Sequence, residues 1–445
     1  MKDNRIRKQQ FLPIRWRIFG FLFIFGLIAY LQQKSLTVTA EQMMPQLHLS
    51  QLQIAFLEQS FLLGYGFFQL PGGIFGQRYG ARRTLVVIGL IAFAAMISTA
   101  IAPYWASGQS LFIALLAAQL ALGIGQAAIF PVSAGLFETW FPPRHWAMVQ
   151  GLQSMGLQVG AAMTPPLVAS LMGAAGWQYA LLVTTLPAIA FIAAWAWYGR
   201  NSPAEHPSVS PEELDEIGAR DEAPVDAGFD GKKLLALLKN RNVLLLFVSY
   251  LCMNYAFYLL ANWVFLYLIQ VRHFSLLESG WLATVPPLAA AAGAGAGGFL
   301  ASALCRRFGL RWGYRLVPLV ALPAGGVLLL IGVGASNAYA AVIALALSYA
   351  FVELTEGSYW GTAMTVGRGN TMTVGGIMNT GGNLGGIIGI PIVGYLSGHQ
   401  MWRAAFLIGT GLAVISALAW LGINTEEDNR IMAPSPAPES IRIAA

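Results

Sequence analysis

Two glutamates stand three residues apart inside an otherwise apolar stretch of this chain. Glu353 and Glu356 belong to the segment AFVELTEGSYWG, residues 350–361. Residues three apart on a helix share a face, so the two carboxyl groups are expected to lie close together. Two neighbouring carboxylates in a medium of low dielectric constant resist being ionised at the same time. We therefore expect at least one of them to accept a proton near neutral pH and to carry it during function.

A single cation interrupts the first apolar stretch. The segment IAYLQQKSLTVTAEQ, residues 28–42, places Gln32, Gln33 and Lys34 in the middle of a run that otherwise reads as a membrane-spanning helix. A charged residue at the centre of such a helix costs about 2.5–3.5 kcal/mol on insertion scales, so its presence indicates a function. We predict that Lys34 faces a polar cavity and supplies a fixed positive charge there.

The composition shows which elements must position these residues. Of the 445 residues, 56% are hydrophobic and 10% are charged, and the mean hydropathy is +0.60. These values exclude a water-soluble globular protein and indicate a polytopic membrane protein. A span needs roughly 20 mostly apolar residues. Twelve such runs occur, at 18–41, 53–76, 83–103, 110–139, 146–172, 177–199, 241–270, 277–304, 312–334, 338–364, 371–397 and 402–423.

The placement of positive charge predicts the orientation in the membrane. Short cytoplasmic loops collect Lys and Arg, whereas exported loops do not. If the N-terminus is cytoplasmic, only Lys34, Arg272 and Arg403 of the 26 basic residues lie away from the cytoplasmic side. We therefore predict a multi-pass protein of the inner cell membrane with both termini in the cytoplasm. The net charge of +6 then reflects this topology and contact with anionic lipids, not with nucleic acid.

The chain divides into two halves joined by a polar linker. We assign residues 1–199 to an N-terminal six-helix half, 200–240 to a cytoplasmic linker, 241–423 to a C-terminal six-helix half and 424–445 to a cytoplasmic tail. The halves are related in sequence, because seven residues of the fifth span and its flank recur in the eleventh. Gly151, Gly156, Gly160, Pro166, Val168, Leu171 and Trp177 recur as Gly376, Gly381, Gly385, Pro391, Val393, Leu396 and Trp402. Parallel repeats of this kind surround a midplane binding site in secondary transporters.

Several motifs resemble those of the major facilitator superfamily. FQLPGGIFGQRYGARR (68–83) is similar to the family signature between spans 2 and 3. FPVSAGLFETWFPPR (130–144), SPAEHPSVSPEEL (202–214) and GGIMNTGGNLGG (375–386) resemble the anion:cation symporter branch, which moves sugar acids and other organic anions. The resemblance implies an all-α membrane protein with twelve transmembrane helices in two pseudo-symmetric six-helix halves, in which spans 1, 4, 7 and 10 line a central cavity.

The same resemblance nominates site residues and shows where this chain departs from the branch. Gln32, Gln33 and Gln126 stand where the branch carries an aspartate, an arginine and a glutamate. A carboxamide does not titrate in the physiological range, so proton coupling falls to Glu353 and Glu356. The candidate substrate-binding residues are Tyr30, Gln33, Lys34, Tyr65, Gln126, Asn379 and Asn383.

Three arginines are candidates for a conformational latch. Arg78, Arg82 and Arg83 occupy the short loop between spans 2 and 3 and would bind carbonyl or acidic groups at neighbouring helix ends, which holds the outward-facing state. Gln77 and Ser302 stand where the two halves of the family carry aspartates. We therefore expect a weaker latch than in the family.

These features together predict a secondary active transporter that works by alternating access. We expect a monomer that moves a small organic anion, a carboxylate, in a proton-linked or exchange-type cycle, and that uses no cofactor and no metal. Two alternatives stay open: an exporter or exchanger for a larger, neutral or cationic ligand, and a nutrient sensor that binds without transporting. No cluster of His, Cys and Asp has the spacing of a catalytic site, which argues against an enzyme.

Overall fold

The first half of the protein is a bundle of six spans. The computed structural model describes residues 12–218, 231–274 and 281–425. The N-terminal spans are built from α1 (Ile14–Leu47), the pair α2 (Gln51–Phe67) and α3 (Gln69–Tyr79), α4 (Ala81–Ile101), the pair α5 (Gly108–Ala127) and α6 (Ile129–Trp140), and α7 (Trp146–Tyr198). The long α7 contains two spans, which meet at Gly176, where φ is +87°. Only glycine adopts this backbone conformation without strain.

The second half repeats this pattern. Its elements are α10 (Arg241–Gln270), α12 (Val285–Gly334), the pair α13 (Ala338–Glu353) and α14 (Glu356–Gly367), α15 (Thr371–Gly398) and α16 (Trp402–Gly422). The two spans within α12 meet at Gly309, where φ is +75°. Within the described residues, eight helical stretches are long and apolar enough to cross a membrane, and two of them, α7 and α12, hold two spans each. The divided pair α2 and α3 and the glycine-rich α15 complete the twelve predicted spans.

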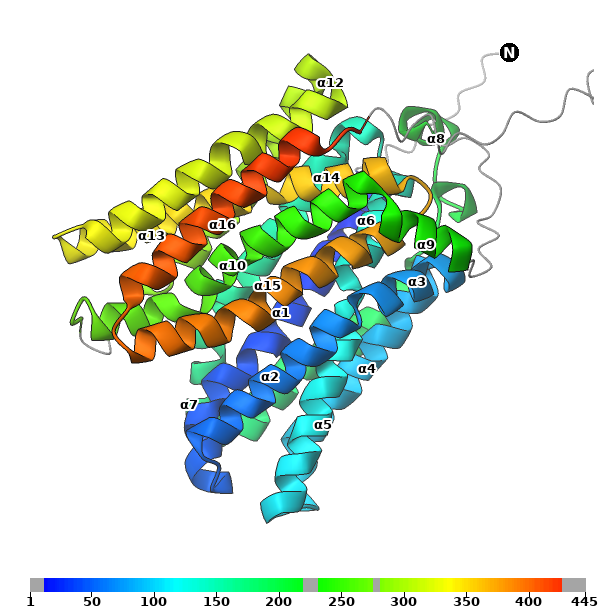
Figure 1. The fold of residues 1–445 in the computed structure, drawn as a ribbon. Helices are drawn as coiled ribbons and strands as arrows, with labels where there is room; N and C mark the ends of the chain where they lie inside the picture. The colour runs from blue at the N-terminus through cyan, green and yellow to red at the C-terminus, as the bar shows by residue number, and fades with distance from the viewer. Residues whose placement is uncertain (1–11, 219–230, 275–280, 426–445) are drawn as a thin grey trace, which may run out of the picture.

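The linker contributes two short helices, α8 (Pro211–Ile217) and α9 (Gly231–Lys239), at one end of the bundle. The carboxylate of Glu213 accepts hydrogen bonds from the backbone N–H groups of Ile14 and Arg15, at 3.1 and 2.9 Å. It thereby satisfies donors that the first turn of α1 leaves unpaired. The Arg15 guanidinium lies 2.7 Å from Glu216, and its hydrogen bond lowers the pKa of that carboxyl. We call this end, where α8, α9 and the start of α1 meet, the linker end (Figure 1).

The two halves pack tightly against each other near the linker end. There α7 packs on α12, and α3 packs on α15. A Cβ atom added at Gly298 would lie 2.7 Å from the carbonyl oxygen of Ala147, and one added at Gly376 would lie 2.8 Å from that of Gln69. Glycine therefore allows the backbones of the two halves to touch. Away from this end the helices of the two halves diverge, as α5 and α13 show in Figure 1.

Hydrogen bonds between neutral groups, and one bond to a carboxylate, join the halves at the linker end. Gln77 donates to the carbonyl oxygen of Gly369 at 2.8 Å, and the N–H of Gly369 donates to the carboxylate of Glu138, also at 2.8 Å. The N–H of Met148 donates to the hydroxyl of Ser302 at 3.1 Å. Gln77 and Ser302, which replace the aspartates of the family signature, are thus themselves contacts between the halves.

Of the three arginines proposed as a latch, Arg82 binds a carbonyl group near the end of a neighbouring helix, as predicted. The Arg82 guanidinium donates to the carbonyl oxygen of Ala196, which belongs to the same half. The Arg78 guanidinium lies over the ring of its neighbour Tyr79, at 5.3 Å from the centroid, and Arg83 is exposed. The contacts described for Arg78 and Arg82 therefore stabilise the N-terminal half, and the bonds between the halves come from other residues.

We predict that Gly298→Ala loosens the contact between α7 and α12. The added methyl group meets a backbone carbonyl that cannot rotate away, and overpacking of this kind costs about 1–3 kcal/mol. Amide hydrogen exchange should accelerate in residues 147–155 and 294–302. Gly411→Ala on α16 is the matched control, because nothing lies within 4 Å of a Cβ atom at that position. Equal exchange in the two variants would show that the close approach at Gly298 does not hold the halves together.

Candidate functional site

A cavity with about 480 Å³ of empty space lies between the two halves. Its walls come from α1, α2, α6 and α7 of the first half and from α10, α13, α14 and α15 of the second. The lining residues are Tyr30, Tyr65, Phe130, Ser154, Leu157, Gln158, Tyr250, Asn254, Phe257, Tyr258, Glu353, Glu356, Asn379 and Asn383.

A break in the tenth span presents both glutamates to this cavity. Glu353 is the last residue of α13 and Glu356 is the first of α14, with Leu354 and Thr355 between them. The break remains hydrogen-bonded, since the N–H of Leu354 donates to Ala350 and that of Thr355 to Val352. Glu353 is 3% exposed and Glu356 is 7% exposed. Both carboxyl groups are therefore shielded from bulk solvent although they line the cavity.

The two glutamates have different hydrogen-bond partners. The carboxylate of Glu356 accepts from the hydroxyl of Tyr250, at 3.0 and 3.2 Å from its two oxygens, and from the indole N–H of Trp360 at 3.0 Å. Glu353 lies beside the amide of Gln158, which also neighbours Tyr349. Glu356 is thus held in place by two donors on different helices, whereas Glu353 has fewer fixed partners.

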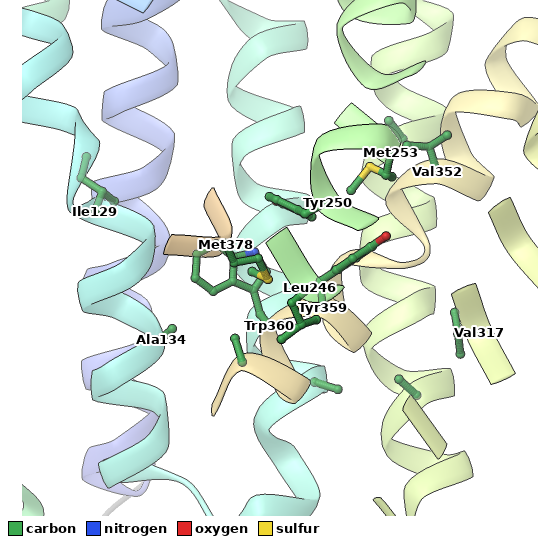
Figure 2. Close-up of a cluster of buried hydrophobic side chains, with 14 of the residues drawn as sticks. Ile129, Ala134, Leu246, Tyr250, Met253, Val317, Val352, Tyr359, Trp360 and Met378 are labelled. Atoms are coloured by element: carbon green, nitrogen blue, oxygen red, sulfur yellow. The ribbon is translucent and has the colours of Figure 1, made fainter. Parts of the chain in front are cut away.

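An aromatic floor separates the cavity from the linker end. Figure 2 shows Tyr250, Tyr359, Trp360 and Met378 grouped where α10, α14 and α15 approach one another. Tyr359, Trp360 and Met378 are fully buried. The hydroxyl of Tyr359 also bonds to those of Ser249 and Ser416, at 2.7 and 2.8 Å. These bonds hold Tyr359 in place, and the fully buried side chains close the cavity on this side.

A chain of amides forms another wall and joins the two halves. The hydroxyl of Tyr258 donates to Asn383 at 2.9 Å, and the side-chain amide of Asn383 donates to the carbonyl oxygen of Asn379 at 2.8 Å. Asn379 in turn donates to the side chain of Gln69 on α3, at 2.9 Å. A movement of one half relative to the other would break or rearrange this last bond.

The structure brings six of the nominated residues together. Tyr30, Tyr65, Asn379, Asn383, Glu353 and Glu356 all line the cavity.

Gln33 and Gln126 do not line the cavity. Gln33 is half-buried. Gln126 donates to the side chain of Gln32 at 3.2 Å and to the carbonyl oxygen of Ala29 at 3.1 Å, within the first half. Both Gln32 and Gln126 line a separate, mostly apolar pocket between α1, α4, α5, α6 and α7.

Lys34 lies about one helical turn from Tyr30, on the side away from the linker end, and is not among the cavity-lining residues. Its side chain is half-buried and interacts with the acid Glu58 of α2. Glu58 also accepts a hydrogen bond from Thr37, at 2.8 Å. The positive charge of Lys34 is thus placed beyond the cavity, toward the end where the halves diverge.

Several cavity residues were not singled out by the sequence analysis. Tyr250, Phe257 and Tyr258 lie on α10, and Ser154 lies on α7. The spacing of Tyr250, Asn254 and Tyr258 was a usable signal, since residues four apart on a helix share a face. Of the fourteen lining residues, only the two glutamates carry a carboxyl group, and none is Lys, Arg or His.

Known transporters resemble this chain over most of its length. "Probable sulfoacetate transporter SauU" of Cupriavidus necator is 28% identical over 418 residues, which are 94% of this chain and 95% of that protein. The hexuronate transporter of Bacillus subtilis is 28% identical over 405 residues, 90% of this chain and 92% of that protein. "Probable galactarate/D-glucarate transporter GarP" of Escherichia coli is 24% identical over 432 residues, 94% and 96% of the two chains. These relatives match the branch that the motifs predicted.

Solved structures share the fold. The proton:xylose symporter XylE superposes with a TM-score of 0.76 at 14% identity, covering 94% of this chain and 99% of its own. A bacterial homologue of ferroportin in an outward-facing state gives 0.70 at 12% identity, covering 92% and 99%. The family profile described as Major Facilitator Superfamily matches residues 22–371. The twelve-helix fold is therefore confirmed, and the chain belongs to the Major Facilitator Superfamily as a membrane transporter, not an enzyme.

Proposed function

We propose that this protein is a secondary transporter that moves a small organic anion together with protons by alternating access. The observation that carries the proposal is the cavity between the halves, which contains two buried carboxyl groups and is closed toward the linker end. The names of the relatives, which refer to sulfoacetate, hexuronate and galactarate or D-glucarate, support a substrate with carboxylate or sulfonate groups. With the linker end in the cytoplasm, as the charge distribution predicts, the structure corresponds to an outward-facing state.

A proton is needed because the cavity lining contains two acidic side chains and no cationic one. A negative charge brought within about 4 Å of an ionised carboxylate costs about 4 kcal/mol at an effective dielectric constant of 20. None of the cavity-lining side chains is a cation that would offset this cost. Protonation of one carboxyl group removes that group's share of the repulsion and offers an O–H donor to the anion. The anion and the proton then bind as a pair, and each makes the binding of the other more favourable.

The two glutamates divide these tasks between them. Hydrogen bonds from Tyr250 and Trp360 stabilise the carboxylate form of Glu356 and hold its orientation. Glu353 lacks such a pair of fixed donors among the described contacts, is as deeply buried, and lies close to the negative charge of Glu356. We therefore assign the transported proton to Glu353 and the fixed charge to Glu356. The phenols and amides of Tyr30, Tyr65 and the other polar lining residues would orient the oxygens of the substrate.

Lys34 has a separate role in this proposal. Its position beyond the cavity, beside Glu58, suits it to attract an anion toward the site without holding it at the end of the path.

The same cavity also supports a second candidate function. Two acids without a cation in the lining are typical of a site for a cationic or neutral ligand, as in an exporter or exchanger. Thermal unfolding of the purified protein with organic acids and with amines distinguishes the two, because a ligand that binds only the folded state raises its apparent stability. Stabilisation by acids supports the anion transporter, and stabilisation by amines alone favours the exporter.

Glu353→Gln should uncouple transport from the proton gradient. The amide is close in size to the protonated carboxyl group but cannot release a proton. In proteoliposomes we expect the variant to lose accumulation driven by a pH gradient while it retains counterflow of labelled hexuronate or sulfoacetate. Glu41→Gln is the matched control, since Glu41 is exposed and lies outside the cavity lining, and it should accumulate substrate as the parent does. Unimpaired accumulation by Glu353→Gln would refute the assignment of the transported proton.

Lys34→Gln should raise the KM for an anionic substrate by roughly two- to fivefold at low ionic strength and leave kcat nearly unchanged. A partly exposed charge speeds the arrival of the substrate more than it changes the translocation step. The difference should shrink as salt is added. Lys34→Arg keeps the charge and serves as the control, with a KM close to that of the parent. A KM for Lys34→Gln that is unchanged at low salt would place Lys34 outside the path of the substrate.

A further inference from the structure

The helix α9 has two chemically different sides and takes no part in the cavity. Its sequence is GKKLLALLK, residues 231–239. At about 100° per residue, Leu234, Leu235 and Leu238 fall on one side of the helix. Lys233 and Ala236 fall on the other, and Lys239 lies at the border, next to Leu235. Such a separation of leucine from lysine is typical of helices that lie in the interface between membrane and water.

The exposure of its side chains shows which direction each side faces. Leu237 is buried in the main hydrophobic core and fixes one edge of α9 to the protein. Leu235 is 51% exposed and Leu238 is 37% exposed, so the leucine side is not covered by the described part of the chain. Lys233 and Lys239 are also exposed. The helix therefore presents apolar and cationic groups to its surroundings at the same time.

A capped turn sets α9 at the base of the seventh span. The side chain of Asn240 accepts from the N–H groups of Asn242 and Val243, at 2.8 and 3.2 Å, and so begins α10 directly after α9 ends. Figure 1 shows the chain bending here, with α9 lying at the linker end close to α3. Leu244 and Val248 of α10 are 46% and 44% exposed, as expected of a span that faces lipid. The leucines of α9 thus stand next to a lipid-facing helix at the level where it leaves the membrane.

We propose that α9 is a binding surface for anionic lipid. Leu235 and Leu238 would enter the acyl-chain boundary, and Lys233 and Lys239 would extend to the phosphate groups, since lysine buries its stem and keeps its charge at the headgroups. Lipid bound at α9 would affect the cavity, because α9 is joined by one capped turn to α10. The helix α10 supplies Tyr250, Asn254 and Tyr258 to the cavity, so lipid bound at α9 anchors the span that forms one cavity wall.

Single spin labels test the proposal directly. The two native cysteines, Cys252 and Cys305, are both buried, so a cysteine introduced on α9 can be labelled selectively. Leu238→Cys reports on the leucine side, and Ala236→Cys, about 160° away around the helix, is the matched control. Each labelled full-length variant is placed in nanodiscs of phosphatidylglycerol or of phosphatidylcholine. Collisions of the label with oxygen, which concentrates in lipid, and with a water-soluble nickel chelate are then measured.

In phosphatidylglycerol we expect nickel collisions at position 238 to fall several-fold below those at 236, and oxygen collisions to rise. The difference should be smaller in phosphatidylcholine, and it should shrink in phosphatidylglycerol when Lys233→Gln and Lys239→Gln are added. Equal nickel collisions at 236 and 238 in phosphatidylglycerol would overturn the proposal. So would protection at 238 that ignores both lipid charge and the lysines, or spin–spin broadening at 238, which would reveal a second copy of the chain on this surface instead.

Discussion

Two carboxyl groups held in one buried cavity without a neighbouring cation constrain the rest of this transporter. The charge of Glu353 and Glu356 cannot be neutralised by the lining side chains, so it must be balanced by protons or, in the exporter alternative, by a cationic ligand. The break between α13 and α14 creates this constraint, because it directs both side chains inward and leaves the backbone bonded. Tyr250 and Trp360 then make the two acids unequal, which is what a proton carrier beside a fixed charge requires.

Contacts between the halves close the cavity at the linker end, so the two carboxyl groups are reached from the other end. Glycines such as Gly298 and Gly376 let the halves touch by backbone contact, and Gln77 and Ser302 add neutral hydrogen bonds across the same contact. Neutral bonds of this kind are individually modest, about 0.5–1.5 kcal/mol each, so a small difference in ligand binding is enough to shift the equilibrium between two arrangements of the halves. The hydrogen bond from Asn379 to Gln69 joins the cavity wall to α3, which takes part in this contact.

Much of this architecture could be predicted from the sequence, and the exceptions have physical causes. Hydropathy and charge indicated twelve spans in two halves, because lipid imposes length and composition on every span. The inward-facing glutamates followed from the high cost of burying charge. Gln126 could not be placed in this way, because a buried amide is satisfied by whichever partner is near, and here that partner is Gln32. Lys34 lies one turn beyond the cavity along α1, and where the cavity ends depends on packing between helices, which a single sequence does not specify.

The binding of a proton to Glu353 together with an organic anion is the central claim, and infrared difference spectroscopy of the reconstituted protein at pH 7, with and without the anion, measures it most directly. The account predicts that the C=O stretching band of a protonated carboxyl group grows when the anion binds, that this gain persists in Glu356→Gln and that it disappears in Glu353→Gln. No gain of the band when the anion binds, or a gain that survives in Glu353→Gln, would contradict it.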